Sequence, residues 1–164
     1  LHPHALFPRT LMKYLVNVYN KQRLVKIADL KIKEIISYVL EDELAPRTMG
    51  MNIMLVRDPV IRRYHRDFMG IDTPTDCISF PPEDLKEANV LEPACGDVVL
   101  SVDHALAYAL QNDVLFPEEI VRYAIHGTLH CLGYDDLDAK SRRSMFAKQE
   151  KYVRAWHSNF YTTK

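Results

Sequence analysis

Two histidines, His126 and His130, are the residues of this chain best suited to chemistry. They stand four positions apart in the segment HGTLHCLGYDD, residues 126–136, so both side chains leave the same face of a helix. Gly133 follows three residues later and can end that helix in the left-handed conformation that glycine adopts at little cost. The chain can then turn back and bring Asp136 toward the imidazoles. Two imidazoles and one carboxylate around an open position are typical of a catalytic zinc site, so the segment predicts a metal-dependent hydrolase.

The carboxylate ligand has competitors close by. Asp135 and Asp138 flank Asp136, and each of the three could meet the histidines. A histidine pair at this spacing, taken without the glycine and the aspartate, would fit a structural role in the core or on the surface equally well. The full pattern favours metal binding by His126, His130 and Asp136.

The residue after the first histidine argues against a protease. In the zincin pattern H-E-x-x-H this position holds the glutamate that acts as general base of peptide hydrolysis. Here it is Gly127, which has no side chain to accept a proton. The spacing is that of H-E-x-x-H-x-x-G-x-x-H, with Gly127 in place of the glutamate and Asp136 in place of the last histidine. A metallopeptidase would need a base from elsewhere in the chain.

Three segments of the chain, in order, resemble one known family. Residues 126–136 are similar to H-G-x-L-H-L-x-G-Y-D-H, residues 74–81 (PTDCISFP) to P-T-D-V-L-S-F-P, and residues 96–101 (GDVVLS) to G-D-I-x-I-S. These are the motifs of the YbeY family, metal-dependent endoribonucleases of ribosomal RNA maturation. The resemblance extends from about residue 14 to 155. Asp136 departs from the family's third histidine, but a carboxylate also binds zinc and harder cations.

The resemblance implies an endoribonuclease that cleaves single-stranded RNA, contributes to ribosomal RNA maturation and ribosome quality control, and uses one divalent ion, with Zn²⁺ expected. It also implies ribosomal RNA, the small ribosomal subunit and assembly factors as partners. Asp76 and Ser79 become candidates for lining the catalytic cleft. Phe68-Met69 stand where many members have Tyr-Arg, so Arg66, or Arg62 or Arg63, is the candidate for a phosphate contact. RNA carries its own nucleophile, the 2′-hydroxyl, so Gly127 suits a nuclease.

Two alternatives belong to other functional classes. The first is a zincin-like metallopeptidase, and the second is a non-catalytic ribosome-assembly factor with a structural metal. His104 stands where a strand would meet a helix, and a structural role is favoured over contact with substrate. Two basic sets could follow an RNA backbone or simply form solvated helix faces. They are Arg57, Arg62, Arg63, His65, Arg66 and Lys140, Arg142, Arg143, Lys148, Lys151, Arg154.

The bulk properties bound the protein class. A chain of 164 residues suggests one hydrolase domain, expected over residues 12–164, with residues 1–11 as a tag or flexible tail. A net charge of −1 restricts any RNA contact to a local patch. No apolar run approaches the ~20 residues of a membrane span. Cys77, Cys95 and Cys131 form no C-x-x-C pair and are expected to be packing residues in a reducing compartment, the cytoplasm.

The hydrophobic pattern supplies the elements that must position these residues. It predicts strands at 15–19, 51–56, 77–80 and 97–101, with the last two as a hairpin-like pair. It predicts helices at 25–44, 58–69, 103–111, from 117 through the histidines, and 139–158. Asp58, Asp103 and Asp138 are the expected N-caps. The predicted fold class is α+β, with a small mixed four-stranded sheet, about five helices and the metal-binding helix central.

Overall fold

A computed structural model of the chain describes residues 14–44, 49–83 and 95–161. Residues 1–11, expected to be a tag or tail, lie outside these ranges. Within them the chain forms four strands and five helices: β1 (Val16–Asn20), α1 (Asp29–Leu44), β2 (Gly50–Val56), α2 (Asp58–Met69), β3 (Cys77–Phe80), β4 (Cys95–Ser101), α3 (Val102–Asn112), α4 (Phe116–Cys131) and α5 (Ala139–Asn159). The predicted α+β class is confirmed. Within the described ranges, no helix is long and apolar enough to cross a membrane.

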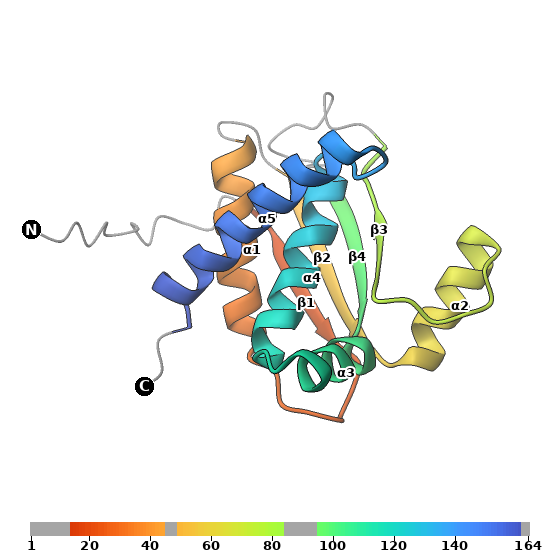
Figure 1. The fold of residues 1–164 in the computed structure, drawn as a ribbon. Helices are drawn as coiled ribbons and strands as arrows, with labels where there is room; N and C mark the ends of the chain where they lie inside the picture. Colours follow the sequence, from red (N-terminus) through yellow and green to blue (C-terminus); the bar gives the residue numbers. More distant parts are fainter. Residues whose placement is uncertain (1–13, 45–48, 84–94, 162–164) are drawn as a thin grey trace, which may run out of the picture.

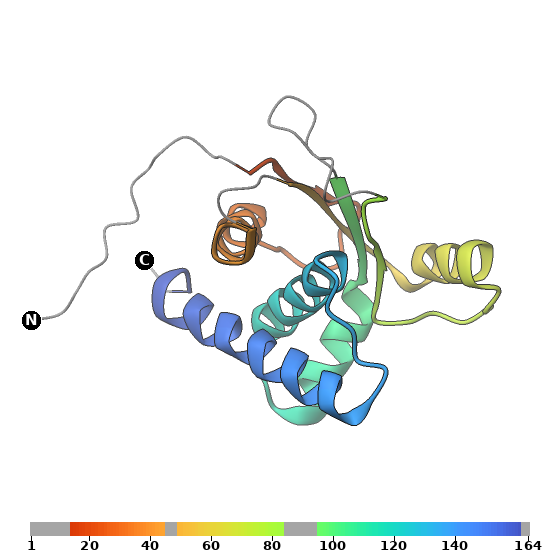
Figure 2. The ribbon, with the colours of Figure 1, turned by 90° about the horizontal axis from the view of Figure 1, so that it is seen from above.

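The sheet is mixed, with strand order β1-β2-β4-β3. β1, β2 and β4 run parallel, and β3 runs antiparallel to β4 at the edge, as the hairpin-like pattern predicted. Figures 1 and 2 show α1, α4 and α5 on one side of the sheet, while α2 lies beyond β3 at the far edge. β3 therefore forms the boundary between the helical layer and α2, next to α4.

Alternation along the strands divides the core into two clusters, because successive side chains point to opposite faces. Ile53 and Val98 belong to the large cluster under α1, α4 and α5. Val99 and Ile78 belong to a smaller cluster under α2. The larger cluster also contains Trp156, so this aromatic residue of α5 is a core residue. α4 packs against α1, α3, α5, β3 and β4, which fixes its position tightly.

Two predicted helix caps are wrong in an informative way. Asp58 is the first residue of α2 and Arg57 its N-cap, while Ser101 caps α3 through its side chain. The Asp103 carboxylate instead accepts the Asp58 backbone N–H at 2.8 Å. β2 and β4 are neighbours that end in register at Val56 and Ser101, so α2 and α3 begin side by side and one helix supplies the cap of the other.

The other helix ends follow local sequence signals, with one exception. Asp138 caps α5 by accepting the N–H groups of Lys140 and Ser141, as predicted, and Gly70 ends α2 with φ +73°. α1 begins at Asp29, four residues later than the apolar pattern predicted. The preceding loop is held by Gln22, whose Oε1 accepts from Leu24 and Val25. These side-chain hydrogen bonds compete with a helical turn.

Candidate metal centre

The two histidines and Asp136 converge at the end of α4. His126 Nε2 and His130 Nε2 lie 3.0 Å apart. Asp136 Oδ2 lies 4.0 Å from the first nitrogen and 3.9 Å from the second. Among the described residues, these three form the one group of histidine, cysteine, aspartate or glutamate side chains close enough to share a metal ion.

Hydrogen bonds on the far side of each ring fix where the imidazole lone pairs point. His126 Nδ1 lies 2.8 Å from Gln149 Oε1, and His130 Nδ1 lies 3.0 Å from the Tyr134 carbonyl oxygen. Both partners are carbonyl oxygens, which only accept, so each Nδ1 carries the donated proton. In the neutral imidazoles the Nε2 lone pairs then face each other at 3.0 Å. Such an arrangement requires a proton or a cation between them.

The spacing of the three atoms suits a first-row divalent ion. A point equidistant from the two Nε2 atoms and Asp136 Oδ2 lies about 2.1 Å from each, the length expected for zinc bonds to imidazole and carboxylate. Each of the three side chains is partly exposed, so a position toward solvent stays open for water or substrate. The group therefore fits a catalytic site better than a closed structural one.

The turn after α4 explains why Asp136 takes this place. Gly133 has φ +98°, and the Tyr134 N–H returns to the Leu129 carbonyl at 3.1 Å, which reverses the chain direction. Arg142 Nη2 then holds the Asp136 carbonyl at 3.2 Å. The competing carboxylates are used elsewhere, because Asp135 Oδ1 accepts from Leu137 N and Asp138 caps α5.

Gly127 faces the sheet, not the metal group. A Cβ at this position would lie 2.6 Å from Val98 Cγ1 and 3.1 Å from Cys77 Sγ. The glycine thus lets α4 approach β4 and β3 closely. A glutamate base placed here, as in a zincin, could not coexist with this packing.

Replacing Gly127 with alanine should therefore destabilise the fold. The added methyl group must displace the buried, β-branched Val98, at a cost of about 1–3 kcal/mol for overpacking. The higher helix propensity of alanine returns about 1 kcal/mol of that. Urea denaturation of Gly127→Ala should give a lower midpoint, and Val98→Ala should cost less stability in the Gly127→Ala background than in the wild type, because it removes the clash. Equal or higher stability of the single variant would contradict this account of Gly127.

A hollow of about 320 Å³ opens beside the histidines. Asp76 and Ser79, predicted to line the cleft, lie in its wall with His126 and His130. Met69, the last residue of α2, lies there as well. Arg66 does not line this hollow. Its guanidinium contacts Asp67 at 3.0 Å and lies 3.9 Å from Asp72.

Two more arginines of the first basic set are also paired, while Arg63 is exposed on α2. Arg57 bonds to Asp103 and Arg62 to Asp72. In the second basic set, Lys148 pairs with Glu43 and Lys151 with Asp42, while Arg142 and Arg143 are exposed at the start of α5. That turn of α5 follows Asp136 closely, so within the two basic sets the residues closest in sequence to the metal group are on α5.

The cysteines are free thiols without nucleophilic character. Burial raises the pKa of Cys77, and burial followed by the charge of Asp97 raises the pKa of Cys131 to about 12. Cys131 is buried, as expected of a packing residue. Cys95, expected to pack, is exposed at the first position of β4, where its sulfur accepts a hydrogen bond from Asn52.

The sequence analysis did not predict a largely buried network of ion pairs around Arg122, one helical turn before His126 on α4. Arg122 contacts Glu118, Glu119 and Glu150 at 2.7–2.8 Å, and Glu119 is only 2% exposed. The E-E-x-x-R spacing on α4 was a local signal for the first two pairs. The pair with Glu150 joins α4 to α5 one residue after Gln149, the partner of His126.

The mixed sheet and the His–His–Asp group define an α+β protein with a candidate site for a divalent metal ion. The chain belongs to the YbeY family: the family model described as "Endoribonuclease YbeY" matches residues 17–157.

Individual relatives are similar in sequence to most of this chain. Endoribonuclease YbeY of Petrotoga mobilis is 34% identical over 138 residues, covering 84% of this chain and 92% of the relative. The protein of the same name from Bacillus velezensis is 30% identical over 146 residues, covering 85% and 93%. The solution structure of TM1509 from Thermotoga maritima superposes with a TM-score of 0.63 at 26% identity, covering 89% and 94%.

Proposed function

We propose that this protein is a metal-dependent endoribonuclease that cleaves single-stranded RNA. The observation that carries the proposal is the meeting of the His126 and His130 lone pairs with Asp136 beside an open hollow. The names of the relatives support RNA as the substrate. Zn²⁺ is the expected ion because two imidazoles and a carboxylate are a zinc ligand set.

The protein groups would divide the work as follows. His126, His130 and Asp136 would hold the ion. The hydrogen bonds from His126 to Gln149 and from His130 to the Tyr134 carbonyl keep the two imidazoles in the binding orientation. When bound, such an ion lowers the pKa of a water ligand or neutralises charge developing on a phosphate oxygen. Asp76 and Ser79 lie in the wall of the same hollow, where a strand placed over the ion would reach them.

Phosphate contacts would come most directly from the start of α5. Arg142 already bonds to the Asp136 carbonyl and keeps four donors, and a guanidinium binds phosphate with paired hydrogen bonds. Arg66 stays a second candidate, one turn before Met69 on α2, but it would have to leave Asp67 and Asp72. Ribosomal RNA as the natural substrate, the small ribosomal subunit and assembly factors as partners, and the cytoplasm as location follow from the family resemblance and belong to this proposal.

The experiment compares four substrates with the zinc-loaded protein: a labelled single-stranded RNA, its duplex, the same sequence as DNA, and an unstructured protein such as casein. The proposal predicts internal cleavage of the single-stranded RNA, abolished by a chelator. Chelator-sensitive cleavage of casein without RNA cleavage would instead favour a zincin-like metallopeptidase. Turnover of none of the four would favour an assembly factor with a structural metal.

A further inference from the structure

A second, larger hollow adjoins the one at the metal group. It has a volume of about 500 Å³, and Asp76 lies in the walls of both. α4 runs past the two, with Tyr123 lining the second hollow and His126 and His130 lining the first. These positions share one helix face, and the helical rise separates Tyr123 from the histidines by about 5–10 Å along the axis.

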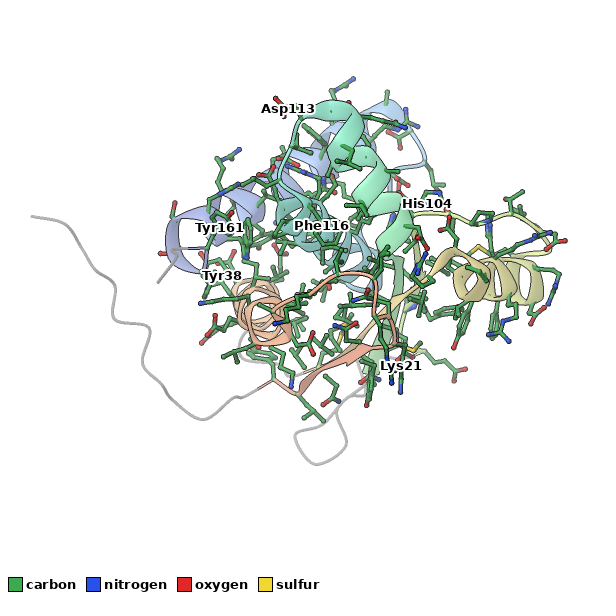
Figure 3. The ribbon with its side chains drawn as sticks, turned by 90° about the horizontal axis from the view of Figure 1, so that it is seen from below. Lys21, Tyr38, His104, Asp113, Phe116 and Tyr161 are labelled. Atoms are coloured by element: carbon green, nitrogen blue, oxygen red, sulfur yellow. The ribbon has the colours of Figure 1, made fainter. Side chains whose placement is uncertain are left out.

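His104 presents one ring nitrogen for recognition in this hollow. Its Nδ1 lies 2.9 Å from Asp58 Oδ1, the same oxygen that accepts the Ser101 hydroxyl at 2.6 Å. Its backbone N–H is held by Ser101 Oγ at 3.0 Å. Figure 3 shows His104 at the start of α3, on the side toward α2. With Nδ1 held by Asp58, Nε2 is the nitrogen that remains for a ligand.

The charges of the hollow exclude a phosphate and do not favour a second metal. Its walls include Asp58, Asp76 and Asp103, so an anion would be repelled. Two of these carboxylates are already paired, Asp58 with His104 and Asp103 with Arg57. In the part of the chain that the structure describes, they do not form a group with three ligand atoms close enough for one ion.

The remaining walls suit an aromatic ligand that donates hydrogen bonds. Tyr108 and Tyr123 supply aromatic rings, and Tyr108 is 47% exposed, so its ring is available for stacking. Gln111 adds an amide. Asp76 Oδ1 accepts from Thr75 and from the Cys77 backbone, while its Oδ2 has no ion-pair partner among the described residues. Burial, followed by the charge of Asp76, raises the pKa of Tyr123, so its hydroxyl stays a neutral donor.

We propose that this hollow is a subsite for one nucleobase of the RNA strand, within one or two nucleotides of the bond cleaved at the metal group, and that it prefers guanine. Guanine offers two adjacent N–H donors that can converge on Asp76 Oδ2, the oxygen left by the bonds from Thr75 and Cys77, whereas uracil presents one N–H between two carbonyls. Tyr108 stacks on the base while the phosphates stay outside, toward Arg142. This inference rests on the proposed function, and it adds base selectivity to it.

The test uses short single-stranded RNAs that differ only in the bases next to the cleaved bond. A pair of hydrogen bonds to a base edge discriminates by about 1–3 kcal/mol, so the zinc-loaded protein should cleave the guanine form about 5- to 150-fold faster, as kcat/KM, than the uracil form. Asp76→Asn, which cannot accept both N–H groups of guanine as a carboxylate does, should remove that preference. Tyr108→Ala should slow cleavage of both forms, and Tyr108→Phe, which keeps the ring, should slow neither, because stacking is tolerant of base identity. Equal rates for all bases in the wild-type protein would overturn the inference.

A binding measurement separates this inference from the proposed function. Guanosine without phosphate should shift the NMR resonances of His104 and Tyr108 in the wild-type protein, and uridine should shift them less. Guanosine binding without any RNA cleavage would overturn the endoribonuclease proposal and leave the subsite standing. RNA cleavage with no response of these resonances to guanosine would overturn the subsite alone.

Discussion

Substitution of His130 by alanine is expected to reduce RNA cleavage by on the order of 10²–10⁴-fold while leaving the protein folded. The variant keeps His126 and Asp136 but loses one of three ligands, and a metal ion contributes several kcal/mol to stabilisation of a transition state of this kind. His130 is partly exposed and packs at the end of α4, so its removal opens little of the core. The measurement is the initial rate of cleavage at saturating zinc, alongside thermal unfolding.

The matched control is His157→Ala. His157 is also a partly exposed histidine with a hydrogen-bonded ring, but its partner is Glu118 and it does not belong to the metal group. It should keep a rate within a few-fold of wild type. Equal activity of His130→Ala and the wild-type protein would assign the cleavage to a contaminating nuclease. Unfolding of His130→Ala would point to a structural metal.

Arg122→Leu should lower the free energy of unfolding by about 3–5 kcal/mol. The change leaves Glu119 buried at 2% exposure without its cation, and an unpaired buried charge is strongly destabilising. It also frees Glu150, which holds α5 against α4 beside Gln149. Urea denaturation measures the loss directly.

Two comparisons check the cause of that loss. Arg154→Leu makes the same change at an exposed position of α5 and should alter stability by less than about 0.5 kcal/mol. Adding Glu119→Gln to Arg122→Leu should recover part of the stability, because the buried group is then neutral. No recovery in the double variant would mean that packing of the arginine stem, not the unpaired charge, sets the cost.

The same network gives a pH signature. Burial raises the pKa of Glu118 and Glu150, but hydrogen bonds from Arg122 outweigh it and hold both values below the ordinary 4.5. A carboxyl group with a lowered folded pKa stabilises the fold above its ordinary pKa and loses that contribution as pH falls through the folded value. Stability should therefore fall on acidification below about pH 4.5, and less steeply in Arg122→Leu. Equal slopes would contradict the role given to Arg122.

Features set by neighbouring residues were predictable from the sequence. The N-cap of α5 at Asp138 and the positive φ values of Gly70 and Gly133 depend on groups only a few residues away. The strands of the sheet follow from alternation and apolar runs in the same way. The histidine pair and the nearby Asp136 could be placed together because a helix and one turn separate them.

Features set by tertiary contacts were out of reach. The caps of α2 and α3 depend on β2 and β4 being neighbours, so Asp103 serves the other helix. Gln149 meets His126, and Glu150 meets Arg122, only because α5 packs on α4. The same reason applies to Asp76, which lies between the two hollows. The pairing of Arg66 with Asp67 and Asp72 is different, because these partners are near in sequence and the motif comparison took no account of them.

The measurement that tests the central claim most directly is a zinc titration of chelated protein, with RNA cleavage and zinc binding followed together in the wild type, Asp136→Ala and Asp135→Ala. Asp135 is the adjacent carboxylate, engaged by Leu137 N and outside the metal group. We predict that cleavage returns in the wild type and in Asp135→Ala as one ion binds per chain, and that Asp136→Ala needs more zinc and regains little activity. Cleavage at the full rate by wild-type protein from which the metal has been removed would contradict the claim that the ion held by this group is needed for the reaction.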